Sequence, residues 1–253
     1  MLPYNYHTHT ARCNHANGTD REYVEAAIQA GVKELGISDH APYLFPNTDY
    51  YSVFRMKKEE LFEYAESVRA LQKEYAKDVK ILLGFELEYY PDFHAGEMEF
   101  LKQVNPDYLI LGQHAICNEI TNPYGSFMKE EAAFRVYISQ AIEGLKTGDF
   151  AYMAHPDLPG YNFPKEVYEE EYLKLCKTAK DLNIPLEINL LGLRTNRHYP
   201  GYRLFEIAAQ VGNKIVLGVD AHSPHEFHHK ESVETAMEWV KTLNLQLIDK
   251  PFI

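Results

Sequence analysis

The sequence contains little cysteine and no long apolar run. Its 253 residues include three cysteines, Cys13, Cys117 and Cys176, which are far apart and form no CxxC pair. An odd number of scattered thiols argues against a disulfide framework and fits a reducing cytoplasm. The longest apolar runs, at 108–111 and 215–217, are strand-sized and far shorter than a membrane span. With no leader-like segment at residues 1–6, we expect a cytoplasmic protein without a membrane partner.

Positive charge is also scarce. The chain has 25 Lys and Arg against 37 Asp and Glu, a net charge of −12. Because proteins bind nucleic acid largely by neutralising its phosphates, we expect no nucleic-acid partner, and a nuclease or proofreading role is disfavoured. Bound divalent ions would add positive charge that this count omits. The residue type in unusual supply is histidine, with 12 copies.

Short β-rich runs alternate with helical patterns along the whole chain. The runs fall at about residues 4–8, 34–38, 79–87, 107–112, 150–154, 185–189 and 214–219. Between the first two, Thr19 and Glu22 form a capping-box pattern, and Gly31 fits the end of the helix that follows. Such alternation is typical of βα units and a parallel sheet.

Seven strand–helix units in a chain of this length predict an α/β fold with a distorted, TIM-like (β/α)7 barrel. We expect a single domain over residues 1–253, and the segment 243–253 has room for one more strand. An open doubly wound sheet is the competing fold. It is disfavoured because no glycine-rich phosphate turn follows the first run.

Metal-ligand side chains stand at the carboxyl ends of nearly all these runs. They are His7, His9, Asp39, His40, Glu86, His114, His155, Asp157, Asp220 and His222. In α/β barrels the active site lies at that face, and imidazole and carboxylate are the usual ligands of zinc, manganese and iron. His7 and His9 lie two residues apart on a strand, so both side chains point to one face, and Asp220 and His222 repeat this spacing. We therefore expect a metal site at the C-terminal face.

The histidines outside these positions are expected at solvated surface positions. They are His94, His198, His225, His228 and His229. Cys13, which lies between His9 and His15, is interpreted as a bystander thiol rather than a soft metal ligand.

Five short motifs match one known family. They are residues 7–10 (HTHT), 38–40 (SDH), 84–86 (GFE), 154–157 (AHPD) and 218–222 (GVDAH). Together they resemble the polymerase-and-histidinol-phosphatase (PHP) superfamily over essentially the whole chain. Within it, the chain is similar to the free-standing histidinol-phosphate phosphatases, and the segments 187–189, 192–194 and 199–200 are similar to that branch as well.

This resemblance implies a cluster of two to three divalent metal ions, with zinc, manganese or iron as the candidates. It implies that His7, His9, Glu86 and Asp220 hold one ion, that Glu86 bridges to a second ion held by His114 and His155, and that His15, His40 and His222 hold a third. All nine residues are present. His15 differs from the others in lying in the first loop rather than on a strand.

The activity implied by the resemblance is hydrolysis of L-histidinol phosphate, a small-molecule phosphate ester, to L-histidinol and phosphate. Two divalent ions can generate hydroxide near neutral pH and clamp a phosphoryl group, so we expect attack by a hydroxide that bridges two ions. Glu86, Asp220 and His222 are the expected catalytic residues. The chain has neither a Cys-x5-Arg loop nor an Asp-x-Asp motif, which argues against a phospho-enzyme.

Phosphate needs fixed positive charge, and arginine offers a bidentate fork. Arg194 and Arg197 follow the sixth strand and are expected to bind substrate, ahead of Arg12, with Asp157 as a further substrate-binding residue. His222, Asp157 and Asp39 are the candidates for protonating the leaving group.

Aromatic loops at 42–45, 49–51 and 119–127 are suited either to a lid over the barrel mouth or to ordinary packing. The alternatives for function are a PHP-type protein-tyrosine phosphatase, a broad-specificity phosphoesterase, or a non-catalytic metal-bound scaffold. The sequence indicates no oligomeric state.

Overall fold

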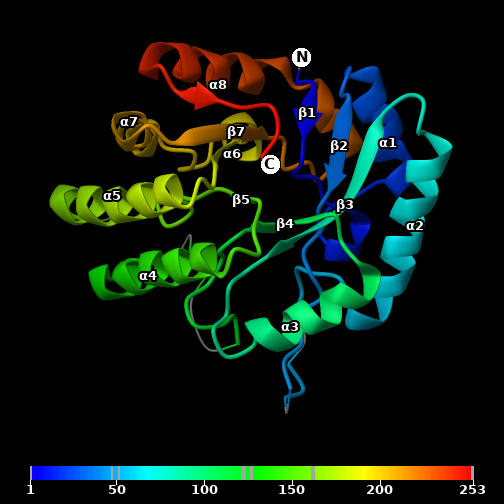
Figure 1. The fold of residues 1–253 in the computed structure, drawn as a ribbon, viewed down its shortest axis with the longest axis horizontal. Helices are drawn as coiled ribbons and strands as arrows, with labels where there is room; N and C mark the ends of the chain where they lie inside the picture. Colours follow the sequence, from blue (N-terminus) through cyan, green and yellow to red (C-terminus); the bar gives the residue numbers. More distant parts are fainter. Residues whose placement is uncertain are drawn as a thin grey trace.

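Strands and helices alternate along the chain in the computed structural model, which describes residues 2–46, 48–50, 52–120, 124–125, 128–160 and 163–251 (Figure 1). The strands are β1 (Tyr4–Asn5), β2 (Glu34–Ile37), β3 (Lys80–Leu87), β4 (Tyr108–Leu111), β5 (Tyr152–Met153), β6 (Leu186–Asn189), β7 (Lys214–Gly218) and β8 (Gln246–Leu247). The helices are α1 (Asp20–Gln29), α2 (Leu61–Glu74), α3 (His94–Leu101), α4 (Glu131–Thr147), α5 (Lys165–Asp181), α6 (Leu190–Arg194), α7 (Tyr202–Val211) and α8 (Lys230–Leu243). Of the shorter segments discussed above, residues 1, 51, 121–123, 126–127 and 252–253 lie outside the described residues.

One sheet contains all the described strands, in the order β1 to β8 and parallel throughout. The segments that follow β1 and β7 are paired by an isolated parallel β-bridge between Thr8 and Ala221. The N–H of His9 donates to the carbonyl of Ala221 at 2.9 Å. The first and seventh strands therefore meet at the C-terminal rim, as a distorted TIM-like barrel requires. The eighth strand, β8, lies within the segment for which the sequence left the strand count open, and its partner among the described strands is the start of β7.

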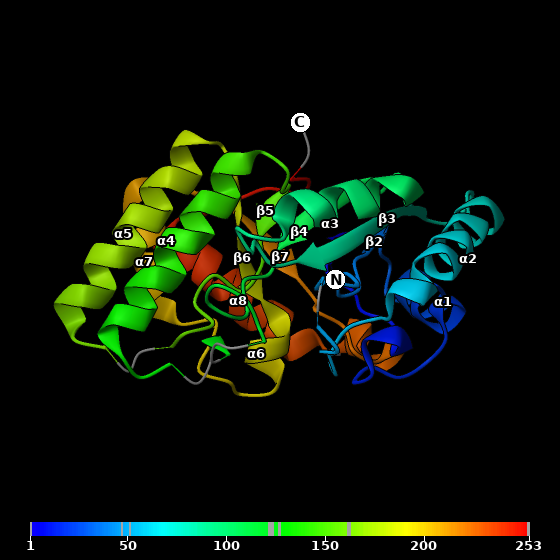
Figure 2. The same ribbon diagram turned by 90° about the horizontal axis from the view of Figure 1, so that it is seen from below.

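Helices cover the outside of the curled sheet (Figure 1). Seen from below, α4, α5 and α7 gather on one side and α1 and α2 on the other (Figure 2). The predicted capping box is confirmed, since Thr19 and Glu22 each bond the other's backbone N–H at the start of α1. In the described part of the chain, no helix combines the length and the apolarity needed to cross a membrane.

The inside of the barrel is filled by a separate apolar cluster. Its main members are Tyr6, Tyr108, Ile110, Tyr152 and Val216. Tyr108 takes up space that side chains at neighbouring strands would need: a Cβ at Gly36 or Gly84 would overlap its phenol ring. Because side chains alternate along a strand, the next inward positions above this layer point to the C-terminal mouth. The tyrosine layer is therefore the floor of the site described below.

The long connection between β2 and α2 is held against α3 by a buried carboxyl group. Glu97, which is fully buried, accepts a hydrogen bond from the backbone N–H of Leu44 at 2.9 Å. Burial raises the pKa of Glu97 to about 8, although the Leu44 N–H and Arg55 oppose the shift and Glu88 adds to it. Glu97 must therefore take up a proton on folding at neutral pH.

Replacing Glu97 with glutamine should stabilise the protein at alkaline pH. A carboxyl whose folded-state pKa is raised contributes full stability below its unfolded value of 4.5, and this stability is lost as pH rises to about 8. Glu97→Gln escapes that loss, which amounts to at most about 5 kcal/mol at about 1.36 kcal/mol per pKa unit. Denaturant unfolding at about pH 5 and about pH 8.5 measures the effect. Glu99→Gln, at an exposed position on the same helix, is the control; an equal Glu97→Gln difference at both pH values would contradict the prediction.

Candidate metal centre

Glu86 is the centre of a buried ring of histidines at the C-terminal mouth of the barrel. Its Oε1 lies 2.7 Å from His155 Nε2 and 3.6 Å from His114 Nε2. Its Oε2 lies 3.0 Å from His40 Nδ1, 3.5 Å from His9 Nε2 and 3.6 Å from His7 Nε2. Glu86 itself is on β3, so one carboxylate connects side chains delivered by the first, second, fourth and fifth strands.

Asp220 forms the second acidic point of the ring. Its Oδ1 lies 3.1 Å from His9 Nε2 and 3.6 Å from His7 Nε2. The nitrogens of His7 and His9 themselves converge to 3.2 Å. The two pairs with two-residue spacing, His7 with His9 and Asp220 with His222, thus lie together because the first and seventh strands meet. Asp220 and His155 both have positive φ, 51° and 26°, a conformation that costs free energy and recurs at functional sites.

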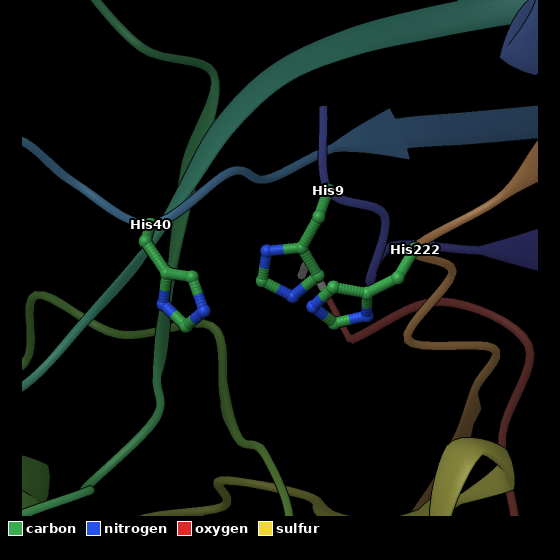
Figure 3. A group of neighbouring side chains, drawn as sticks. All are labelled: His9, His40 and His222. Atoms are coloured by element: carbon green, nitrogen blue, oxygen red, sulfur yellow. The ribbon is translucent and has the colours of Figure 1, made fainter. Parts of the chain in front are cut away.

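His9, His40 and His222 lie together beside these carboxylates (Figure 3). The rings of His9 and His222 are stacked, with their centroids 4.2 Å apart. The rings of His9 and His40 are tilted relative to each other, with their centroids 4.4 Å apart. His15 joins from the first loop, with its ring centroid 4.6 Å from that of His222. The structure thus brings the nine predicted ligands to one rim.

Cys13 also reaches this side of the ring. Ligand atoms of Cys13, His15 and His222 lie within 4.8 Å of one another, and the thiol is buried. His15 is oriented by its Nδ1, which lies 2.7 Å from the carbonyl of Cys13. Its Nε2 is therefore free of this contact, as a ligand atom must be.

A second layer of carboxylates, largely missed by the sequence reasoning, orients the histidines. Glu187 Oε1 lies 2.8 Å from His7 Nδ1, and Glu88 Oε1 lies 2.6 Å from His114 Nδ1. Asp39, which the sequence placed among the ligand-type side chains at the strand ends and among the candidate proton donors, lies 3.3 Å from His9 Nδ1 and accepts from Thr10. Each contact holds one ring nitrogen and leaves the other facing the cluster, the usual arrangement behind metal-bound histidines. The available signal was spacing: Glu88, just past the end of β3, lies two residues beyond Glu86, and in an extended chain this spacing keeps both side chains on the same face.

The two central carboxyl groups are held in their charged form. Burial alone would raise the pKa of Glu86, but the imidazoles around it, His40 first, outweigh burial and hold the pKa well below its usual value. The pKa of Asp220 is likewise well below its usual value, because His7 and its neighbours outweigh burial. Burial lowers the pKa of His9, but the Asp220 and Asp39 carboxylates outweigh it and raise the value to about 9. Burial holds the pKa of His40 and His222 well below the ordinary value, so both rings are neutral and have a lone pair to donate.

The donor set fits divalent cations. Among the described residues, Glu86 Oε2, Asp220 Oδ1, His40 Nδ1 and His222 Nε2 are buried and make no hydrogen bond of acceptable geometry, although ring nitrogens and carboxylate oxygens of the cluster lie close to them. Buried polar atoms are normally paired, so such converging unpaired atoms indicate a missing positive partner. Nitrogen and carboxylate oxygen ligands are those preferred by zinc, manganese and iron. The residues of the ring are therefore suited, in ligand type and in position, to bind divalent metal ions.

A cavity of about 760 Å³ opens directly over the ring. Its walls include Val53, Phe54, Tyr124, Leu191, Arg197 and Tyr199 together with the clustered ligands. Among the described lining residues, Arg197 is the one with a permanent positive charge; it is exposed, and its Nη1 donates to Tyr199 Oη at 2.6 Å.

The other two predicted substrate-binding residues lie away from the cavity wall. Arg194 donates to the carbonyls of Val219 and Asp220 at 2.5 and 2.7 Å and pairs with Glu226 at 2.8 Å. It therefore braces the end of β7 behind Asp220. Asp157 is fully buried and accepts from the N–H of Gly201 at 2.5 Å, and burial raises its pKa to about 7. Arg12 is engaged by Asp20 and Glu63.

One surface prediction was wrong. His94 begins α3 and is only 8% exposed, with its Nε2 2.8 Å from Asp149. The sequence predicted a solvated position for it, and no local pattern signals the burial, because the carboxylate it contacts lies 55 residues away.

Comparisons with known proteins agree with this site. A family model described as the PHP domain matches residues 5–190. A probable histidinol-phosphatase of Deinococcus radiodurans is 34% identical over 234 residues, which cover 87% of this chain and 86% of the relative. The crystal structure of histidinol phosphate phosphatase from Lactococcus lactis, complexed with zinc, L-histidinol and phosphate, is similar in fold with a TM-score of 0.75 at 20% identity, covering 98% of this chain and 96% of that one.

A more distant likeness is to a structure from work on metal-dependent tyrosine phosphatases of Bacillus subtilis and Streptococcus pneumoniae. Its TM-score is 0.56 at 16% identity, and the match covers 94% of this chain and 87% of that one. At this identity the likeness concerns the fold alone. The match to residues 5–190, the extent of the 34% identical relative and the ring of ligands lead to one conclusion: this chain belongs to the PHP domain family.

Proposed function

We propose that this protein is a metal-dependent phosphomonoesterase that hydrolyses L-histidinol phosphate to L-histidinol and phosphate. The choice of substrate is based on the 34% identical relative named a probable histidinol-phosphatase, which matches over most of both chains. The ring of buried ligands around Glu86 supports the reaction class. The cavity supports a small organic ester, since about 760 Å³ lies within the usual range for small-molecule sites.

The metal ligands are assigned in three groups. His7, His9, Glu86 and Asp220 would hold one ion, Glu86 with His114 and His155 a second, and His15, His40 and His222 a third. Divalent ions held there would supply a nucleophile from water at neutral pH and would offset the charge on the phosphoryl oxygens. Zinc, manganese and iron all suit this donor set.

The chain's own groups then bind and orient the ester. Arg197 binds phosphate oxygens at the cavity mouth, and Tyr199 holds its guanidinium in place. Val53, Phe54 and Leu191 form an apolar wall for the organic part of the substrate and limit the access of water. Of the three groups considered for protonating the leaving group, Asp39 and Asp157 do not line the cavity, and His222, which does, is assigned to the third ion.

The substrate is tested by phosphate release from L-histidinol phosphate, p-nitrophenyl phosphate and a phosphotyrosine peptide with metal-loaded enzyme. We expect kcat/KM for L-histidinol phosphate to exceed the other two by at least about a hundredfold. Preference for the phosphotyrosine peptide would instead support a tyrosine phosphatase. Similar low values on all three would support a broad-specificity phosphoesterase.

Removing the Arg197 guanidinium should weaken the binding of the substrate's phosphate group. A hydrogen bond to a charged group contributes about 1.5–3 kcal/mol, so Arg197→Met should lower kcat/KM by about 10- to 100-fold. Steady-state kinetics checks this against Arg203→Met, a control on α7 whose guanidinium pairs with Glu169. Unchanged kcat/KM in Arg197→Met would rule out the phosphate role.

A further inference from the structure

Arg55 is a buried arginine in the irregular segment between β2 and α2. It is 2% exposed. Its guanidinium donates to the carbonyl of Ala41 at 3.0 Å, to Glu88 Oε1 at 3.0 Å and to both carboxylate oxygens of Glu119. Ala41 follows β2, Glu88 follows β3 and Glu119 follows β4. One side chain therefore ties together three loops at the mouth of the barrel.

The contact with Glu88 connects Arg55 to the metal centre. Glu88 is fully buried, and the same Oε1 that accepts from Arg55 lies 2.6 Å from His114 Nδ1. An imidazole that donates from Nδ1 presents its Nε2 lone pair on the other side. His114 Nε2 is the atom that lies 3.6 Å from Glu86. The position of the Glu88 carboxylate thus sets the direction in which His114 faces.

Arg55 also fixes one wall of the cavity. The residue before it, Phe54, lines the cavity, and its ring centroid lies 5.7 Å from that of His40 and 6.2 Å from that of His114. The Arg55 guanidinium lies 4.6 Å from the centre of the Phe54 ring. Val53, the next residue on this wall, is 74% exposed and has little packing of its own to hold it. Arg55 therefore contributes to the anchoring of this segment, together with the buried Met56 that follows it.

We propose that Arg55 is a positioning residue that couples the substrate-facing loop to the metal centre, by holding Glu88 against His114 while it holds Phe54 over the cavity. This proposal rests on the proposed function, because it takes His114 as a metal ligand. Partners behind metal-bound histidines typically change metal affinity by about 10- to 100-fold when they are lost. A purely structural arginine would instead change folding stability alone.

The test measures zinc retention by the zinc-loaded enzyme in a chelator titration, together with thermal stability. Arg55→Met should release zinc at a chelator concentration about 10-fold lower than the wild-type enzyme does. Arg55→Lys keeps the charge but loses the planar guanidinium. Its zinc-release midpoint should therefore lie between those of Arg55→Met and the wild-type enzyme. The control is Arg69→Met, which removes a half-buried arginine that pairs with Asp107 at 2.7 Å near the start of β4, at the opposite end of the barrel. It should lose stability and keep the wild-type zinc midpoint.

Phe54→Ala separates the two parts of the proposal. It leaves the Arg55–Glu88 contact in place, so we expect a wild-type zinc midpoint and a raised KM for L-histidinol phosphate. Arg55→Met should change both the zinc midpoint and the KM. If the zinc-release midpoint of Phe54→Ala were shifted as far as that of Arg55→Met, the proposal that Arg55 acts on His114 through Glu88 would be wrong.

Other outcomes distinguish failure of this proposal from failure of the proposed function. If Arg55→Met loses stability as Arg69→Met does but retains zinc like the wild-type enzyme, Arg55 is only structural and the proposal is wrong. If Arg55→Met does not fold, the zinc midpoint of Arg55→Lys decides in the same way. His114→Ala tests the premise: wild-type zinc retention in that variant would remove His114 from the ligand set, and with it the proposed second metal site.

Discussion

Replacing Glu86 with glutamine is expected to lower kcat/KM by about 10³-fold and to reduce the bound metal measured by elemental analysis. Metal ions contribute several kcal/mol to such reactions, and about 1.36 kcal/mol corresponds to a factor of ten. Glu86 contributes both oxygens to the ring: Oε1 lies 2.7 Å from His155 and Oε2 lies 3.0 Å from His40. Glutamine has nearly the same shape but offers one neutral acceptor oxygen, and its amide would point N–H groups at the position of a cation.

The matched control for this variant is Glu97→Gln. It makes the same change at another fully buried glutamate, one that contacts Leu44 rather than any histidine of the ring. Glu97→Gln should keep its metal content and stay within about twofold of wild-type kcat/KM, because it removes no interaction with the transition state. If Glu86→Gln retained full metal content and its kcat/KM fell by less than about tenfold, Glu86 would not be a bridging ligand.

Much of this site could be predicted because strand periodicity acts on residues close together in the sequence. His7 with His9, and Asp220 with His222, have the two-residue spacing that directs both side chains inward. The parallel arrangement then brings every strand's carboxyl end to one rim. The ring around Glu86 is therefore a consequence of local sequence patterns and a single topological expectation.

The supporting residues could not be predicted in the same way, because their roles depend on contacts between distant segments. Glu187 is a buried strand residue whose partner, His7, lies 180 positions earlier. Arg194 follows β6, where a phosphate-binding arginine was expected, yet its guanidinium donates to the carbonyls of Val219 and Asp220. Arg197, three residues on, lines the cavity. Strand periodicity predicts which side chains face inward, but it does not predict which side chains or carbonyls they contact.

The glycines next to the acidic residues are a further feature that only the structure explains. Gly218 lies beside Glu187 and Gly112 beside Glu86, and in each case an added Cβ would overlap the carboxylate. A glycine at the end of a strand is ordinarily assigned to a turn. Here both glycines have backbone conformations open to any residue, since neither has a positive φ. Their role is to leave space for a buried carboxylate.

Gly112→Ala is therefore expected to damage the centre although it removes no functional group. The new Cβ would overlap Oε1 and the carboxyl carbon of Glu86 and would lie 2.5 Å from its Cγ, so the carboxylate must move. Gly112 is held by its N–H, which donates to the carbonyl of Leu87 at 3.1 Å, and the strand has little freedom to yield. Displacing a catalytic group by about 1 Å can cost about 100-fold in rate, and we expect a loss of that size in kcat/KM.

The control is Gly96→Ala on α3, where an added Cβ meets nothing within 4 Å. Because alanine is favoured over glycine inside a helix by about 0.5–1 kcal/mol, Gly96→Ala should be slightly stabilised and fully active. Steady-state kinetics, bound-metal analysis and thermal unfolding of both variants separate a displaced carboxylate from a general loss of fold. A folded Gly112→Ala enzyme with wild-type kcat/KM and metal content would mean that Glu86 can occupy a second position without cost, and the central role assigned to its two oxygens would then be wrong.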